Sequence, residues 1–218
     1  NDTYPLWYAQ EMEGIRTGVR VGNLSLIAVD WYINQVRRRV NKSAPIKLSI
    51  SEENYRGDSR MQLYINDPKE TTRNAADVLK FVNEKHPLPL QSGQSIETYI
   101  PARKVSIPID RAKAIASGLV SANDTNVVSQ IEISFAGNYL MKDDLAVLDI
   151  ITSNLYERPI YFASTANLDK LVGLNNYTQV EGMGARIVPV LSPQDGRFGQ
   201  YGYGRVNTEK IYENITKK

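Results

Sequence analysis

The sequence predicts an α/β protein built on a Rossmann-like, three-layer mixed sheet that is mainly parallel and carries antiparallel hairpin additions. Near the N-terminus a helical pattern, a short apolar run and a second helical pattern follow one another, which is the order of a parallel α/β unit. A helix followed by a short apolar strand recurs at 143–163. Of the 218 residues, 42% are hydrophobic and 23% are charged, as in a soluble globular domain. We therefore expect a single soluble domain over 1–218.

The first predicted element is a helix at 5–13 that no strand precedes. Asp2 or Thr3 can cap this helix, and Pro5 suits its first turn because the missing N–H would be unpaired there. Gly14 supplies a stop. Because the helix opens the sequence, we expect the first strand of the sheet to be missing from it.

The second and third predicted elements are a buried strand and a helix. The apolar, β-branched run at 19–27 favours the strand. Asp30 is expected to cap a helix that extends to about Val40. The residues expected to face the core from this helix are Trp31, Ile33 and Val36.

The middle of the chain, about 45–140, predicts an irregular subdomain. A cap at Asp67 is expected to open the helix at 75–83, since Pro68 and Glu70 follow at positions typical of a helix start. The other expected elements are strands at 46–50, 61–65 and 104–109, and a hairpin of 131–135 with 139–141 around Gly137.

The C-terminal third predicts further α/β structure and a loop. The expected elements are a helix at 143–153, a buried strand at 159–163, a hairpin of 177–180 with 186–190, a Gly/Tyr-rich loop at 192–205 and a C-terminal helix at 207–216.

Charge and residue usage exclude several classes of function. The formal net charge is +2 with the signs interspersed, so no field of one sign attracts nucleic acid or an anionic membrane. The basic run 37–39 is expected to complement the end of a helix. With no cysteine and one histidine, His86, neither a zinc site nor a Ser-His-Asp device is expected. We expect no metal and no cofactor, the catalytic residues stay unknown, and no apolar run is long enough to insert into a bilayer.

Two groups of residues are candidates for binding a ligand. In doubly wound sheets, ligands collect beyond the carboxyl ends of the strands. The residues expected to converge there are Asn1, Asp2, Thr3, Asn23, Ser25, Ser164 and Thr165. Ordinary helix capping explains most of them equally well. The second group offers aromatic faces and guanidinium groups that stack on sugars or peptides, although a plain surface loop is the alternative. Its members are Arg197, Tyr201, Tyr203 and Arg205.

Four blocks of the sequence together resemble one bacterial family. The blocks are NDTYPLWYAQEMEGIRTGVRVGNLSL, DWYINQVRR, YLMKDDLAVLDIITSNLYERPIYFAST and GRVNTEKIYENI. They resemble domain-of-unknown-function family 2723, large polytopic membrane proteins common in the Bacteroides group. Their membrane half is similar to protein O-mannosyltransferases, and the resembling region follows the membrane spans.

The resemblance implies a soluble accessory domain at the periplasmic face of the inner membrane, within a larger integral membrane protein. The catalytic carboxylate of such a glycosyltransferase would lie in the membrane half, so the isolated domain is expected to be non-catalytic. Its expected partners are the membrane-spanning half of the same chain and an acceptor protein, a glycan or a neighbouring subunit. The alternative is a Rossmann-like sugar-nucleotide or sugar-phosphate enzyme with a site near Asp2. A structural cap over the membrane half is a third possibility, and it predicts an exposed apolar patch.

Overall fold

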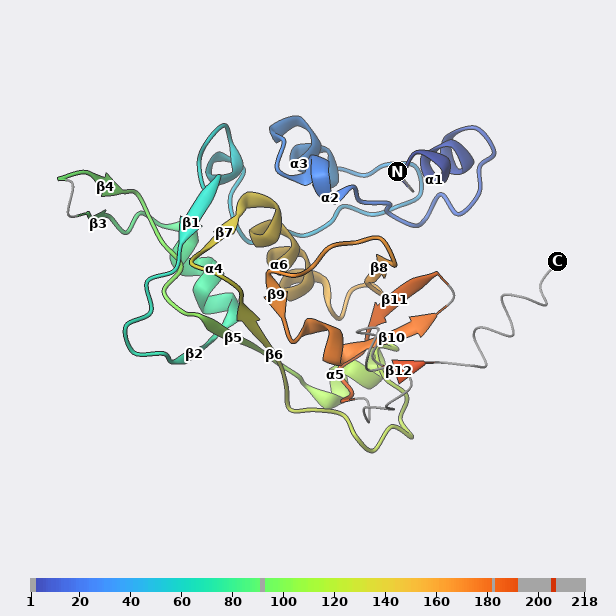
Figure 1. The fold of residues 1–218 in the computed structure, drawn as a ribbon. Coiled ribbons are helices and arrows are strands. Elements are labelled where there is room, and N and C mark those ends of the chain that lie inside the picture. The colour runs from blue at the N-terminus through green and yellow to red at the C-terminus, as the bar shows by residue number, and fades with distance from the viewer. Residues whose placement is uncertain (1–2, 91–92, 182, 192–204, 207–218) are drawn as a thin grey trace. The chain divides into compact units, whose positions relative to one another are not determined.

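The structure is a computed structural model that describes residues 3–90, 93–181, 183–191 and 205–206 (Figure 1). The chain divides into two compact units. The first unit comprises 1–66, 76–101 and 138–153, and the second comprises 67–75, 102–137 and 154–218. Each unit is described by itself below.

The first unit holds most of the helices (Figure 1). Its helices are α1 (Thr3–Glu11), α2 (Leu24–Ile27), α3 (Asp30–Val36), η1 (Glu53–Tyr55), α4 (Ala75–Asn83) and α6 (Lys142–Asn154), of which the last two each share one end residue with the second unit. Its strands form two antiparallel pairs, β1 (Gln62–Tyr64) with β7 (Tyr139–Met141) and β3 (Leu88–Pro89) with β4 (Ser95–Ile96).

The core of the first unit draws on one face of α4 and one face of α6. Their apolar residues recur three and four positions apart, which places them on a single side of each helix. The residues are Val78, Leu79 and Val82 in α4 and Leu145, Leu148 and Ile151 in α6, all fully buried.

The second unit holds two four-stranded sheets. The first has the order β2-β5-β6-β9, with β2 (Thr72–Asn74), β5 (Lys104–Pro108), β6 (Gln130–Phe135) and β9 (Leu171–Val172). The second has the order β12-β10-β11-β8, with β12 (Arg205–Val206), β10 (Thr178–Glu181), β11 (Gly184–Ile187) and β8 (Tyr161–Ala163). The helices of this unit are α5 (Arg111–Ala116) and η2 (Leu174–Tyr177).

The α/β class is confirmed, but the described strands do not form a mainly parallel, Rossmann-like sheet. Among the described strands only β2–β5 and β10–β12 pair in parallel, and the other pairs are antiparallel. A parallel pair needs a long crossover. Here β5 leads through the short helix α5 into β6, which returns antiparallel to β5. The sheets therefore stay small and mixed.

The strand expected at 19–27 is wrong. Asn23 instead caps α2, since its side-chain oxygen accepts a hydrogen bond from the Leu26 backbone N–H at 3.2 Å. Ile27 is buried, whereas Val19 is 53% exposed. A short apolar run does not by itself separate a strand from a helical segment, and the cap decides the outcome here.

The helix expected after Asp30 forms as α3, but two details of the prediction are wrong. Val29 is the N-cap, and the Asp30 carboxylate accepts a hydrogen bond from the Gly57 backbone N–H at 2.6 Å instead. The residue that faces the core beside Ile33 is Tyr32, while Trp31 is 60% exposed. The prediction therefore placed Trp31 on the buried face of the helix, where the structure has its neighbour Tyr32.

Three helices and one hairpin of the sequence prediction are confirmed, as α1, α4, α6 and the antiparallel pair β10–β11. Asp67 does not cap α4, because β2 intervenes and the Asp67 carboxylate accepts from the Arg103 backbone N–H at 2.8 Å. The hairpin expected around Gly137 is wrong, since β6 pairs with β5 and β9 while β7 pairs with β1.

The predicted C-terminal elements lie outside the described residues, apart from one short strand. The loop expected at 192–205 and the helix expected at 207–216 belong to this part of the chain, of which only β12 is described. Among the described helices, none combines the length and the hydropathy that crossing a bilayer requires.

Candidate functional site

Of the residues expected at one sheet edge, the structure brings Thr3 and Asn23 together. The Asn23 side-chain amide donates to the Thr3 hydroxyl at 3.2 Å, and the Asn23 backbone N–H donates to the Tyr32 hydroxyl at 2.8 Å. Ser25 is exposed in α2. These contacts join α1, α2 and α3, so capping and helix docking account for Thr3 and Asn23 without a ligand.

Apart from Ser25, the other predicted residues that the structure describes belong to the second unit. Ser164 and Thr165 are exposed after β8 in the second unit, whereas Thr3 and Asn23 belong to the first. Arg205 lies in β12, where its backbone pairs with that of Gln179. The predicted residues outside the described part are Asn1, Asp2, Arg197, Tyr201 and Tyr203.

Asp149 is a fully buried carboxylate in the first unit, and the sequence did not single it out. One carboxylate oxygen accepts from the Ser49 N–H at 2.8 Å, the Ser49 hydroxyl at 2.7 Å and the Ser153 hydroxyl at 3.0 Å. The other accepts from the Ile50 N–H at 3.0 Å and the Tyr55 hydroxyl at 3.2 Å. Burial and then this carboxylate hold the pKa of Tyr55 well above its usual value. Asp149 thus anchors the irregular chain before η1 on α6, and its acceptor positions are occupied.

Lys142, at the start of α6, is also fully buried. Its ammonium donates to the backbone carbonyls of Tyr55, at 3.0 Å, and of Gly57, and it lies 3.7 Å from the Asp30 carboxylate. A buried side chain with these partners fixes a loop, and hydrogen bonds to two backbone carbonyls engage its nitrogen. Its role is structural.

The second unit carries a polar cluster on the sheet β10-β11-β8. The Tyr161 hydroxyl donates to one Glu181 carboxylate oxygen at 2.6 Å, and the Gln179 amide donates to the other at 2.7 Å. The Arg186 guanidinium lies 3.8 Å from the same carboxylate. Burial and then the hydrogen bond to Glu181 raise the pKa of Tyr161 to about 12. A tyrosine held protonated in this way does not serve as a general base near neutral pH.

A hollow in the second unit, with a volume of about 270 Å³, is lined by Leu168, Asp169, Gly173 and Asn175 among others. Asp169 is its one carboxylate, so it offers no paired acid and base. Within the described residues no three metal-binding side chains of His, Cys, Asp or Glu gather at one point.

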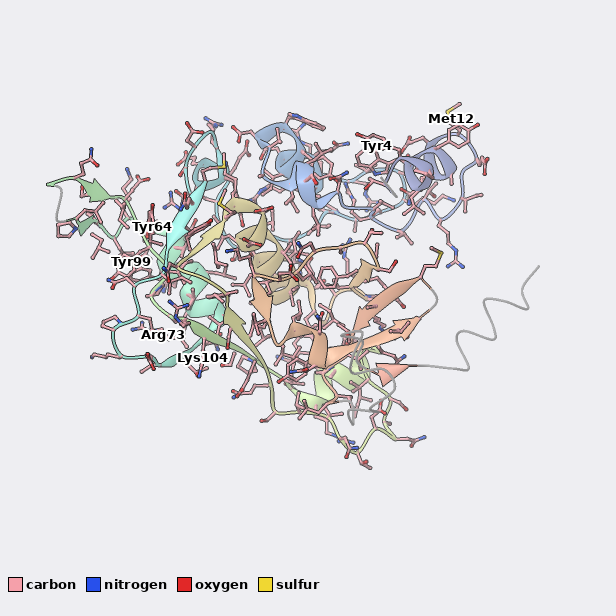
Figure 2. All side chains as sticks on the ribbon, in the orientation of Figure 1. Tyr4, Met12, Tyr64, Arg73, Tyr99 and Lys104 are labelled. Carbon is pink, nitrogen blue, oxygen red and sulfur yellow. The ribbon has the colours of Figure 1, made fainter. Side chains whose placement is uncertain are left out.

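The candidate functional site is instead an exposed apolar surface in the first unit. We call this set the N-terminal aromatic surface, and its members are Tyr4, Tyr8, Met12, Ile15, Val19 and Trp31, each 50–71% exposed. No residue of α1 is buried although most of the helix is apolar. A helix of this composition normally buries a face. Figure 2 shows Tyr4 and Met12 along α1 and its end.

Ring contacts hold the N-terminal aromatic surface in place. Trp7 meets Tyr4 edge-on with centroids 5.7 Å apart and meets Tyr32 at 6.2 Å. Trp31 in turn meets Tyr32 edge-on at 5.5 Å. Burial raises the pKa of Tyr32, whose hydroxyl accepts from Asn23. The aromatic rings of α1 and α3 therefore contact one another in a chain that runs through the buried Tyr32. These contacts favour a fixed position of α1 relative to α3.

The sequence pattern predicted α1 but not the exposure of its apolar residues. One signal for it was present, because Tyr4, Tyr8 and Met12 recur every four residues and so share one side of the helix. Tyrosine, tryptophan and methionine are also enriched in contact surfaces. An exposed apolar patch is the feature expected of a structural cap over the membrane half.

Comparison with known proteins gives the family of the chain. A family model described as TMEM260-associated domain 2 matches residues 1–210. No curated protein and no solved structure matches the chain. The resemblance to family 2723 and to the Bacteroides group stays a prediction beside this match. Because the model spans nearly the whole sequence, the chain belongs to the TMEM260-associated domain 2 family.

Proposed function

We propose that the chain is a non-catalytic accessory domain of a membrane-embedded, protein O-mannosyltransferase-like glycosyltransferase, and that it attaches to its partner through the N-terminal aromatic surface. The match to a TMEM260-associated domain and the resemblance to polytopic glycosyltransferase-like proteins support the class of the parent. The observation that carries the proposal is the exposure of α1, in which no residue is buried and most apolar side chains face solvent.

The state of the polar groups supports a non-catalytic role. The buried ionic groups Asp149 and Lys142 are engaged by backbone and hydroxyl groups of the first unit. In the second unit, Tyr161 is held protonated against Glu181. A transfer site needs an acid or base free to reach the sugar, and none of these groups is free in that way. The chemistry is therefore assigned to the membrane half of the parent.

The partner proposed first is that membrane-spanning half, at the periplasmic face of the membrane. Contiguous apolar patches on the surface of a folded domain mark the places where it meets another structure. An acceptor protein or a glycan is the further partner that such an accessory domain would help to hold.

Co-expression of the chain and the membrane-spanning half as separate polypeptides tests this proposal. The tagged chain is expected to capture the membrane half, and the variant Tyr8→Ser/Met12→Ser is expected to lose most of that capture. Met183→Ser is the matched control, because Met183 is 87% exposed in the second unit. Equal capture by all three proteins would contradict attachment through the N-terminal aromatic surface.

A further inference from the structure

We propose that the N-terminal aromatic surface, together with a set of neighbouring cations, docks on the lipid–water interface of an anionic membrane. This inference rests on the proposed function, because an accessory domain of a membrane protein would lie at the surface of the membrane. The contact is peripheral, at the depth of the headgroups, since no described helix has the properties of a membrane span.

The apolar part of the surface has the composition of a membrane-interface contact. Tyr4, Tyr8 and Met12 follow one another along one side of α1 and its end, and the Met12 N–H donates to the Tyr8 carbonyl at 2.9 Å in continuation of the helix. Trp31 adds a tryptophan to the surface. Tyrosine and tryptophan are the side chains that gather at headgroup level, because their rings are apolar while their polar atoms stay hydrated.

The cationic part lies in the segment 14–42, which begins three residues after the end of α1. It holds six basic residues and one acidic residue, whereas the whole chain carries a formal charge of only +2. The acidic residue, Asp30, pairs with the buried Lys142. Four of the basic residues are exposed and form no ion pair with any other described residue. They are Arg16, Arg38, Arg39 and Lys42.

Hydrogen bonds hold these cations beside the apolar residues. The Asn41 amide donates to the Glu11 carboxylate at 2.7 Å, which fixes the turn after α3 against the end of α1. The Arg20 guanidinium donates to the backbone carbonyl of Arg38. The Gln10 amide donates to the Arg16 carbonyl at 3.1 Å. The cations and the aromatic side chains therefore belong to one locally connected surface of the first unit.

Charge complementarity favours a lipid surface over a second copy of the chain. Exposed guanidinium groups that pair with no carboxylate among the described residues match the phosphates of anionic headgroups, to which they donate paired hydrogen bonds. A second copy would instead place these cations opposite one another. Glu11 and Glu13 lie at the end of α1, and Glu11 is already engaged by Asn41. Helices that rest on membranes combine the same two features, an aromatic apolar side and adjacent basic residues.

The chain carries its own reporter for this contact. It has two tryptophans, Trp7 and Trp31, and both belong to the α1–α3 region. Trp31 is largely exposed, so its emission is expected to shift to shorter wavelength when the surface enters a headgroup layer. Fluorescence therefore reports on this surface without a label.

The test is binding of the 218-residue chain to vesicles of phosphatidylcholine alone and of phosphatidylcholine with phosphatidylglycerol. We expect co-sedimentation with the anionic vesicles, a blue shift of tryptophan emission, quenching by brominated lipid, and weaker binding as salt is raised. Arg38→Gln/Arg39→Gln is expected to lower the affinity for anionic vesicles roughly tenfold or more. Tyr8→Ser/Met12→Ser is expected to remove the blue shift. Met183→Ser is expected to keep both the affinity for anionic vesicles and the blue shift.

A folded chain that stays in the supernatant with both kinds of vesicle overturns the inference, as does a dimer in solution whose emission is already shifted. Binding that Tyr8→Ser/Met12→Ser does not weaken also overturns it. Capture of the membrane-spanning half without vesicle binding removes the lipid inference alone. Vesicle binding without that capture removes the attachment to the membrane half alone.

Discussion

The side-chain amide of Asn41 donates a hydrogen bond to the carboxylate of Glu11 across 2.7 Å, although the two residues are 30 positions apart in the sequence. This contact joins the basic turn after α3 to the end of α1. It explains how a chain with a small net charge presents cations and aromatic rings on one surface.

Asn41→Ala tests this link. The hydrogen bond is exposed, so its loss is expected to lower the free energy of unfolding by no more than about 1 kcal/mol. The same variant is expected to weaken binding to anionic vesicles, because the basic turn is no longer fixed beside α1. Urea unfolding and vesicle co-sedimentation measure the two effects, and unchanged vesicle binding would contradict the role assigned to the contact.

Trp31 and Ile33 provide a paired test of which residue belongs to the core and which to the surface. Ile33 is fully buried, so Ile33→Ala is expected to lower the free energy of unfolding by about 3 kcal/mol. Trp31 is 60% exposed, so Trp31→Ser is expected to change that free energy by only about 0.5 kcal/mol while it weakens partner binding. Urea unfolding of both variants checks the assignment, and equal destabilisation would contradict it.

Asp149→Asn removes the charge that five donor groups of the first unit share. The amide side chain of this variant would also place an NH₂ donor where a carboxylate oxygen now accepts hydrogen bonds, so some of these donors would lose their acceptor. We expect the free energy of unfolding to fall by about 3 kcal/mol, as measured in urea. Asp169→Asn is the matched control, because Asp169 is exposed and its variant is expected to unfold like the wild type. An Asp149→Asn variant of full stability would mean that this carboxylate does not anchor the chain before η1.

Alkaline titration tests the polar cluster of the second unit. The folded-state pKa of Tyr161, about 12, lies above the ordinary value of 10.0. Protonated Tyr161 therefore contributes stability that is fully present below pH 10 and is lost as the pH rises through about 12. Ultraviolet absorbance is expected to show one phenolate that titrates near 12, absent in Tyr161→Phe. Glu181→Gln should move that titration toward lower pH, and an unmoved titration would assign it to another residue.

The helices were predictable where a single periodic pattern decided them. In α4 and α6 the apolar residues recur at helical spacing over more than two turns, and both helices form as expected. The segment 19–27 was not predictable in the same way, because its apolar run suits a strand and a helix equally. The Asn23 cap and the hydrogen bond to the Tyr32 hydroxyl decide it, and the latter joins residues nine positions apart.

The candidate site was less predictable than the helices, for a related reason. The sequence places Arg37–Arg39 at a helix end and Tyr8 in a helix, but it does not show that Asn41 and Glu11 bring these segments together. Nor does it show that Trp31 is exposed while Tyr32 is buried, because the two residues are adjacent in the same helix and both are aromatic. Long-range side-chain contacts create this surface, and local patterns do not encode them.

Hydrogen exchange is the most direct test of the central claim that the N-terminal aromatic surface is where the domain meets its partner. The measurement compares the isolated chain with the same residues in the full-length parent protein in its membrane. We expect slower exchange in the parent over 3–15 and 37–42, with little change over β10 and β11. Unchanged exchange in those two segments, with new protection elsewhere in the described residues, would contradict the account.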